Sequence, residues 1–232
     1  VYAVGNSFLG VGTVVRCGAG SNSCATLTPG TTSILNAVWG SDGSNVYAVG
    51  GSSLGASVVV RCSIGSDVCT ALTTGSMGQL RAVWGSDGAN VYAVGDRGII
   101  VRCAAGSNNC APLISGTTSD LAGVWGSDRA NVYAVGKKGA LRCASGSSTC
   151  NALTGGSQAL LAVSGSDADS VYAAGLGGEV VRCTSGSGNC TSLTAGDKSD
   201  FNSVWGSDPT NVYVVGSSGA KVLRCNAGTA FC

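Results

Sequence analysis

The sequence predicts an all-β fold of repeated small sheets, because it combines a regular repeat, strand-like runs and abundant glycine. The string V-Y-A-V-G, or a near copy, begins at positions 1, 46, 91, 132, 171 and 212, at intervals of 45, 45, 41, 39 and 41 residues. Glycine accounts for 38 of the 232 residues, and no stretch has the 3.6-residue apolar period of a helix. The repeat covers the whole chain, so we expect a single domain over residues 1–232.

Each repeat contains four short runs with the composition of β-strands, as residues 35–40, 46–50, 58–62 and 69–73 illustrate. The first two runs alternate between two faces, the third is rich in β-branched residues, and the fourth closes the unit. Gly, Ser, Asp or Asn bounds each run, as in strands joined by tight turns. Four strands in about 40 residues, repeated six times, predict a six-bladed β-propeller, with a linear β-solenoid as the alternative.

The repeat also resembles a known family. Residues 39–50 read W-G-S-D-G-S-N-V-Y-A-V-G, which is similar to the V-W-G-S-x-x-x-x-V-Y-A-V-G repeats of secreted bacterial β-propellers, abundant in myxobacteria. The resemblance covers all six units and implies the propeller architecture, but the motif implies no particular activity. The regularly spaced cysteine pair departs from the commoner form of these repeats, which usually has no cysteine there.

Twelve cysteines fall into six pairs, each with a spacing of seven residues and a glycine at the third position of the intervening loop. Such a glycine suits a tight reversal with positive φ, and facing ends of antiparallel strands bring Cα atoms to about 4.5–5.5 Å, which suits a disulfide. Zinc sites favour closer cysteines, and the chain has no histidine, so neither a metal nor a cofactor is expected. Reactive thiols beside the adjacent arginines are the other alternative, but six identical copies are untypical of an active site. The predicted disulfides join Cys17 to Cys24, Cys62 to Cys69, Cys103 to Cys110, Cys143 to Cys150, Cys183 to Cys190 and Cys225 to Cys232.

Composition excludes several classes of function. The 13 Lys and Arg residues are offset by 12 Asp and Glu, so a basic face that binds nucleic acid is not expected. No segment approaches the ~20 apolar residues of a membrane-spanning helix, so membrane insertion is not expected either. Disulfides form in oxidising compartments, and we therefore expect a secreted protein, extracellular or on the cell surface. The chain starts with Val and shows no signal peptide, so it is expected to be a mature product or a fragment.

Aspartate recurs in the G-S-D turn that follows the first run of a repeat. Its carboxylate is expected to accept hydrogen bonds from backbone N–H groups of the turn, since one carboxylate per turn is too few for a calcium loop. We also expect the arginine before each first cysteine to pair with one of these aspartates, from its own or a neighbouring repeat. The aspartates are Asp42, Asp87, Asp128, Asp167 and Asp208.

Tryptophan occupies one repeat position, where Ser164 stands in the remaining copy. This position shares a strand face with other apolar residues, so the tryptophans are expected to pack between repeats. The alternative is a set of platforms on which sugar rings stack. The residues concerned are Trp39, Trp84, Trp125 and Trp205.

A contact surface, if the protein has a specific one, is expected where the repeats differ from one another; the alternative is that these solvated loops vary without any function. The turn after V-Y-A-V-G is long in the first two repeats, and short and charged in the third and fourth. An inner-strand position also changes, from Asn36 to an arginine in the next repeat. The candidate contact residues are Arg81, Arg97, Lys137 and Lys138.

An enzyme needs a poised acid, base or nucleophile, and this chain has no histidine and a single glutamate, Glu179. We therefore predict a non-enzymatic extracellular structural protein that self-associates into a surface layer or filament. The first repeat lacks its inner strand and the last lacks part of an outer one, and an open sheet edge invites strand addition from another chain. The alternative is a lectin-like adhesion module with glycans as its partners.

Overall fold

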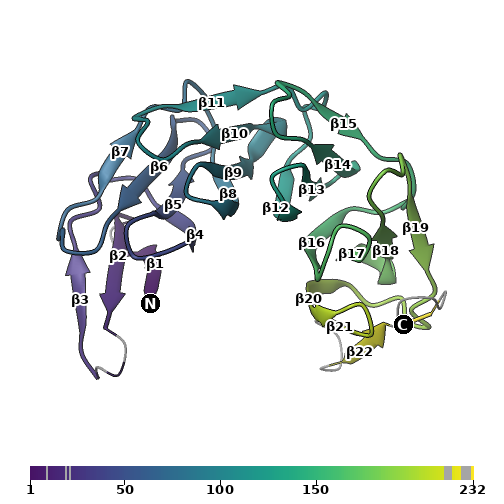
Figure 1. Cartoon of the computed structure of the whole chain (residues 1–232). Helices are drawn as coiled ribbons and strands as arrows, with labels where there is room; N and C mark the ends of the chain where they lie inside the picture. Colours follow the sequence, from purple (N-terminus) through teal and green to yellow (C-terminus); the bar gives the residue numbers. More distant parts are fainter. Residues whose placement is uncertain (9, 19, 21, 217–220, 226–230) are drawn as a thin grey trace. The chain divides into compact units, whose positions relative to one another are not determined.

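The computed structural model describes residues 1–8, 10–18, 20, 22–216, 221–225 and 231–232. Over these residues the fold is all-β, which confirms the predicted fold class (Figure 1). It contains six antiparallel sheets and two single-turn 3₁₀ segments, η1 (Asp96–Gly98) and η2 (Leu176–Gly178), and the described residues include no α-helix. Nor do they include a helix long and apolar enough to cross a membrane. The chain divides into two compact units, Val1–Leu113 and Ile114–Cys232.

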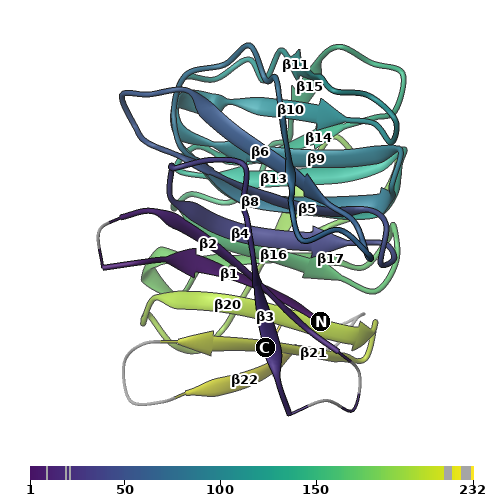
Figure 2. The same ribbon diagram turned by 90° about the vertical axis from the view of Figure 1, so that its left-hand side faces the viewer.

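The first unit contains three sheets, and within each sheet the strands lie side by side in chain order, as Figure 2 shows for β4, β5 and β6 of sheet 2. Neighbouring strands are antiparallel and are joined by short turns. The strands are β1 (Tyr2–Asn6), β2 (Gly12–Cys17) and β3 (Cys24–Leu27) in sheet 1; β4 (Leu35–Gly40), β5 (Val46–Gly51), β6 (Ser57–Cys62) and β7 (Thr70–Leu72) in sheet 2; and β8 (Leu80–Asp87), β9 (Asn90–Gly95), β10 (Ile100–Cys103) and β11 (Cys110–Leu113) in sheet 3.

The second unit repeats this arrangement in three further sheets. Its strands are β12 (Leu121–Asp128), β13 (Asn131–Gly136), β14 (Gly139–Cys143) and β15 (Cys150–Ala152) in sheet 4; β16 (Leu160–Gly165), β17 (Val171–Gly175), β18 (Val180–Cys183) and β19 (Cys190–Leu193) in sheet 5; and β20 (Phe201–Asp208), β21 (Asn211–Gly216) and β22 (Val222–Cys225) in sheet 6. The four-strand pattern expected for each repeat is therefore complete in sheets 2 to 5.

In sheets 2 to 5 the V-Y-A-V-G run is a strand buried on both faces. In β5 all six residues are buried, because sheets pack against the strand from either side. Tyr47 and Val49 belong to a core shared with Val91 of sheet 3, whereas Val46 belongs to a core shared with Val14 of sheet 1. A strand covered on both faces needs apolar residues at every position, which explains why this run is apolar throughout rather than alternating.

The glycine that ends V-Y-A-V-G is required by a close approach of two backbones. A Cβ atom on Gly95 would lie 2.0 Å from the carbonyl oxygen of Gln79, and a Cβ on Gly50 would lie 1.9 Å from that of Ile34. In sheets 2 to 6 the first strand has a register shift at its start, which brings the carbonyl of the residue before the strand over the glycine. Gly5, at the same repeat position in sheet 1, has no atom within 4 Å of its Cβ position.

Candidate functional site at the junctions between sheets

Six disulfides join the cysteine pairs identified by their spacing, and no described cysteine is free. The glycine in each described cysteine loop has a φ between +70° and +83°, as expected for a tight reversal. These glycines are Gly20, Gly65, Gly106, Gly146 and Gly186. Gly228, in the last loop, lies outside the described residues. The six disulfides indicate an oxidising, extracellular type of environment.

Two backbone hydrogen bonds link the second cysteine of a sheet to the preceding sheet, and we call this pair the outer latch. The Thr28 N–H donates to the carbonyl of Asp67 at 2.8 Å, and the Cys69 N–H donates to the carbonyl of Thr28 at 2.8 Å. The Cys69 N–H therefore faces the neighbouring sheet rather than Cys62, as in a narrow, non-hydrogen-bonded strand pair. This explains why the Cα–Cα distances of the disulfides, 3.9–4.3 Å, are shorter than expected. The residues equivalent to Thr28 in later latches are Thr73, Ile114 and Thr154.

Because the disulfide Cys103–Cys110 lies on the latch formed with Thr73, its removal should loosen the edge of sheet 3 and its contact with sheet 2. We expect the double substitution Cys103→Ala, Cys110→Ala to lower the free energy of unfolding by about 2.5 kcal/mol, the chain-entropy value for an eight-residue loop. Guanidinium unfolding of the non-reduced protein measures this change. Ser107→Ala, in the same loop, is the control and should cost at most about 1 kcal/mol, since it removes only side-chain hydrogen bonds. A double substitution no more destabilising than this control would contradict the stabilising role of the disulfide.

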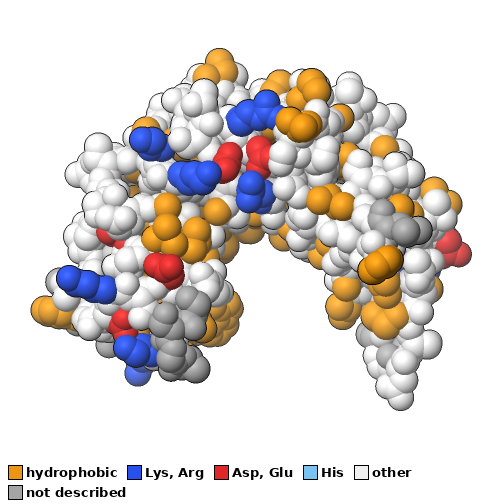
Figure 3. All heavy atoms as spheres, turned by 180° about the vertical axis from the view of Figure 1, so that it is seen from behind, with side chains coloured by type: hydrophobic (Ala, Val, Ile, Leu, Met, Phe, Trp, Pro, Cys, Tyr) orange, Lys and Arg blue, Asp and Glu red, His pale blue; other side chains and the backbone are white. Residues whose placement is uncertain are grey.

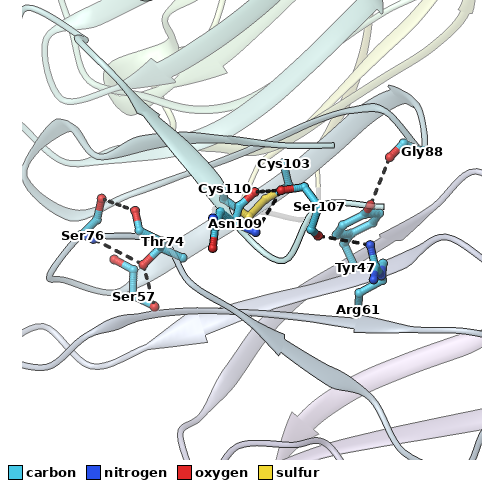
Figure 4. Close-up of a disulfide and its surroundings, with 10 residues drawn as sticks. All are labelled: Tyr47, Ser57, Arg61, Thr74, Ser76, Gly88, Cys103, Ser107, Asn109 and Cys110. Atoms are coloured by element: carbon cyan, nitrogen blue, oxygen red, sulfur yellow. Dashed lines mark hydrogen bonds between the residues drawn. A yellow bond between two sulfur atoms is a disulfide. The ribbon is translucent and has the colours of Figure 1, made fainter. Parts of the chain in front are cut away.

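Figure 4 shows the disulfide Cys103–Cys110 beside the contacts between sheets 2 and 3. The hydroxyl of Tyr47 donates to the carbonyl of Gly88 at 3.0 Å, and Nη1 of Arg61 donates to the carbonyl of Ser107 at 3.3 Å. Burial raises the pKa of Tyr47. The tyrosine and the arginine of one repeat thus bind the turns of the next repeat.

The structure corrects the expected pairing of the repeated arginines with the G-S-D aspartates. Arg16 forms an ion pair with Asp67 at 3.0 Å, and Asp67 belongs to a cysteine loop rather than to a G-S-D turn. Arg182 donates to the backbone carbonyl of Asp169 at 3.0 Å. The arginines bind loops and carbonyls because the carboxylates of the G-S-D turns are already engaged within those turns.

In the G-S-D turn the carboxylate bonds to the turn itself. Oδ1 of Asp42 accepts the backbone N–H groups of Ser44 at 2.6 Å and Asn45 at 3.0 Å, and the Asn45 side-chain amide lies 3.2 and 3.1 Å from the two carboxylate oxygens. These hydrogen bonds hold the pKa of Asp42 below its ordinary value, and the hydrogen bond from the Asn45 side chain has the largest effect. The predicted structural role is confirmed, and the same backbone contact recurs at Asp87, Asp128, Asp167 and Asp208.

Tryptophans pack one sheet on the next where both sheets lie in the same unit. A Cβ on Gly85 would lie 2.6 Å from the ring of Trp39, and a Cβ on Gly165 would lie 2.8 Å from the ring of Trp125. Each ring therefore occupies space that only a glycine of the next sheet leaves open. Trp84 is half-buried. Trp205, in contrast, is 59% exposed.

The residues predicted as a contact surface are mostly bound within their own unit. Arg81 pairs with the buried Asp96 at 2.6 Å. Burial alone would raise the pKa of Asp96, but the hydrogen bond and charge of Arg81 lower it. Arg97 has a φ of +55° and donates to the backbone carbonyl of Ser53.

In the second unit, Lys137 pairs with Asp120 at 2.9 Å. Lys138 is exposed and lines a hollow with Thr117, Leu121 and Leu141. Within the described part of the chain, no three or more His, Cys, Asp or Glu side chains gather where a metal ion could bind.

Comparison with known proteins finds no family model and no curated protein that matches the chain. Function is therefore inferred from the junctions themselves. At these junctions the tyrosine, arginine and tryptophan of one repeat contact the next repeat, and the two cysteines join strands of their own sheet.

Proposed function

We propose that the six sheets are the blades of a six-bladed β-propeller, and that the protein is a non-enzymatic extracellular structural protein that self-associates into a surface layer or filament. The sixfold repeat, the disulfide of each sheet and the contacts between successive sheets support this proposal. A location outside the cell agrees with the oxidising environment that the disulfides require.

The observation that carries the proposal is the tryptophan-on-glycine contact. Trp39 meets Gly85 and Trp125 meets Gly165, so the contact joins equivalent surfaces of successive sheets. A surface that accepts the next sheet of the same chain can accept the corresponding sheet of another copy. Such a contact is head-to-tail, and a head-to-tail contact that does not close into a ring builds a filament.

Sheet 6 presents the apolar residues that such a contact would cover. Trp205 is 59% exposed and Val215 is 42% exposed, whereas Val49 and Val135, equivalent to Val215, are fully buried. The net charge of +1 would not oppose association, and on the face shown in Figure 3 Lys and Arg side chains lie close to Asp and Glu side chains. An uncovered tryptophan and valine on a weakly charged protein therefore support self-association.

The engagement of the carboxylates supports a non-enzymatic role. Glu179 accepts hydrogen bonds from the hydroxyls of Ser157 at 3.1 Å and Ser192 at 3.0 Å, and the G-S-D aspartates are engaged in their turns. The glycan-binding alternative requires exposed aromatic platforms, but Trp39 and Trp125 are already packed on glycines. The contacts at the junctions thus favour a structural, self-associating protein over a glycan-binding module.

Negative-stain electron microscopy of the non-reduced protein at several concentrations tests this proposal. We expect fibres or sheets that become more abundant as concentration rises, because self-association follows mass action. Averaged images should show rings of six blades, and an elongated rod would instead support the solenoid. Uniform single particles at every concentration would overturn the self-association and direct attention to a glycan-binding screen.

A further inference from the structure

We infer that a hollow in sheet 4 binds a carboxylate group carried on a short aliphatic arm, either that of a free organic acid or that of an acidic side chain in a peptide. The hollow, which we call the sheet 4 hollow, lies between the turn that joins β13 to β14 and the loop that precedes β12. The site lies within the second unit and does not depend on the proposed self-association.

The sheet 4 hollow combines apolar walls with polar groups that can donate hydrogen bonds. Its volume is about 180 Å³, and the buried side chains of Leu121 and Leu141 line it. Thr117, Ser119 and Lys138 supply the polar part of the lining. The oxygen of the Thr117 hydroxyl accepts the Ser119 N–H at 3.1 Å, so its proton remains available for donation. The lining therefore suits a ligand that is aliphatic at one end and accepts hydrogen bonds at the other.

The hollow is present because sheet 4 has a glycine where neighbouring repeats have a side chain. The position four residues before the first cysteine of a pair holds Ile99 in sheet 3, Gly139 in sheet 4 and Glu179 in sheet 5. Ile99 packs against the core of its own unit. No atom lies within 4 Å of the Cβ position of Gly139. The space that a side chain takes in the neighbouring repeats is thus open beside Gly139.

Sheet 5 shows which chemical group fits this space. The carboxylate of Glu179 accepts hydrogen bonds from the hydroxyls of Ser157 at 3.1 Å and Ser192 at 3.0 Å. A Cβ on Gly156 would lie 3.2 Å from the side chain of Val181 and 3.6 Å from the Glu179 carboxylate. The repeat equivalents of Gly156, Val181 and Ser192 in sheet 4 are Thr117, Leu141 and Ala152, and all three line the hollow. The place that a carboxylate occupies in sheet 5 is therefore the place that the hollow offers in sheet 4.

Sheet 4 also provides a positive charge where sheet 5 provides a negative one. Residues 178–179 of sheet 5 are Gly-Glu, and residues 138–139 of sheet 4 are Lys-Gly. Lys137 pairs with Asp120, whereas Lys138 is exposed and forms no ion pair within the described part of the chain. An ammonium group attracts a carboxylate and donates a charge-assisted hydrogen bond to it. The hollow therefore favours a carboxylate over a neutral group of the same shape.

A titration of butanoate into the non-reduced 232-residue chain, followed by amide chemical shifts, tests the site. Butanoate carries one carboxylate on a short aliphatic chain, and we expect saturable shifts at the amides of Gly139 and Leu141. The neutral butanamide should give no saturable shift at the same concentrations. Absence of saturable shifts with butanoate, or equal shifts with the two compounds, would overturn the inference.

A blocked Gly-Glu-Gly tripeptide distinguishes the two sources of the carboxylate. Saturable shifts at the same amides would show that an acidic side chain of a peptide enters the hollow. Shifts with butanoate but not with the tripeptide would restrict the ligand to free organic acids.

A pair of lysine variants tests the role of Lys138. Lys138→Met keeps the aliphatic stem but removes the ammonium group, and should weaken butanoate binding by about fivefold. Lys198→Met removes another exposed lysine, which is outside the hollow, and should change binding by less than about twofold. Equal effects of the two variants would mean that butanoate responds only to net charge and would overturn the site.

A third variant tests the equivalence with sheet 5 by a gain in affinity. Ala152→Ser introduces the hydroxyl that donates to the Glu179 carboxylate from the equivalent Ser192. A serine is already accommodated at this strand position in sheet 5, and the added donor should tighten butanoate binding by about threefold or more. Unchanged or weaker binding in a variant whose other amide shifts are preserved would show that the carboxylate does not lie as Glu179 does, and would overturn the inference.

Discussion

Gly95→Ala should lower the free energy of unfolding by about 3 kcal/mol or more, among the largest effects of any single substitution in this chain. The added methyl group would lie 2.0 Å from the carbonyl oxygen of Gln79. That oxygen belongs to the backbone at the start of the sheet and accepts the N–H of Asp96 at 2.9 Å, so it cannot move without breaking this bond. Guanidinium unfolding followed by tryptophan fluorescence measures the change.

Gly5→Ala is the control for this prediction. Gly5 ends the V-Y-A-V-G run of sheet 1, and no atom lies within 4 Å of its Cβ position. We therefore expect Gly5→Ala to change the free energy of unfolding by less than about 0.5 kcal/mol. If the two variants proved equally destabilising, the glycine would be required for the conformation of its own backbone and not for the approach of the neighbouring strand.

These two glycines show what the repeat could predict and what it could not. The strands, the cysteine pairing and the aspartate turns depend on residues close together in the sequence, and they were predictable from one repeat. The close approach at Gly95 depends on a register shift in the preceding strand, which has no signal within the V-Y-A-V-G run itself. The recurrence of this glycine in every repeat indicated that the position is constrained, but it did not indicate that a neighbouring backbone carbonyl is the cause.

The outer latch was not predicted, because it depends on how two sheets stack. Thr28 and Asp67 are far apart in the sequence, and their hydrogen bond requires both sheets to be in place. The available signal was the threonine that recurs at the end of the fourth run, at Thr28, Thr73 and Thr154. The predicted pairing of the arginines with the G-S-D aspartates was wrong for a related reason. Each of these carboxylates accepts hydrogen bonds from its own turn, as Asp42 does from Ser44 and Asn45.

The tryptophans allow the contribution of contacts between sheets to be measured separately from that of contacts within one sheet. Trp39 and Trp205 share one repeat position, but Trp39 packs on Gly85 of the next sheet and Trp205 is 59% exposed. Trp39→Ala should lower the free energy of unfolding by about 2–3 kcal/mol, because it opens a cavity between sheets 2 and 3. Trp205→Ala should cost less than about 0.5 kcal/mol in the dissociated protein. Similar losses in the two variants would show that the tryptophan stabilises its own sheet rather than the junction.

A double-mutant cycle with Gly85→Ala isolates the contact itself. In the unmodified chain the methyl group of Gly85→Ala meets the ring of Trp39 at 2.6 Å and should destabilise the protein by about 1–3 kcal/mol. In the Trp39→Ala background the ring is gone, so the same methyl group fills part of the cavity and should be tolerated. The coupling energy should therefore be favourable and of order 1–2 kcal/mol. Additive losses would mean that the ring and the glycine do not act as a pair, and the basis for a transferable contact between blades would be lost.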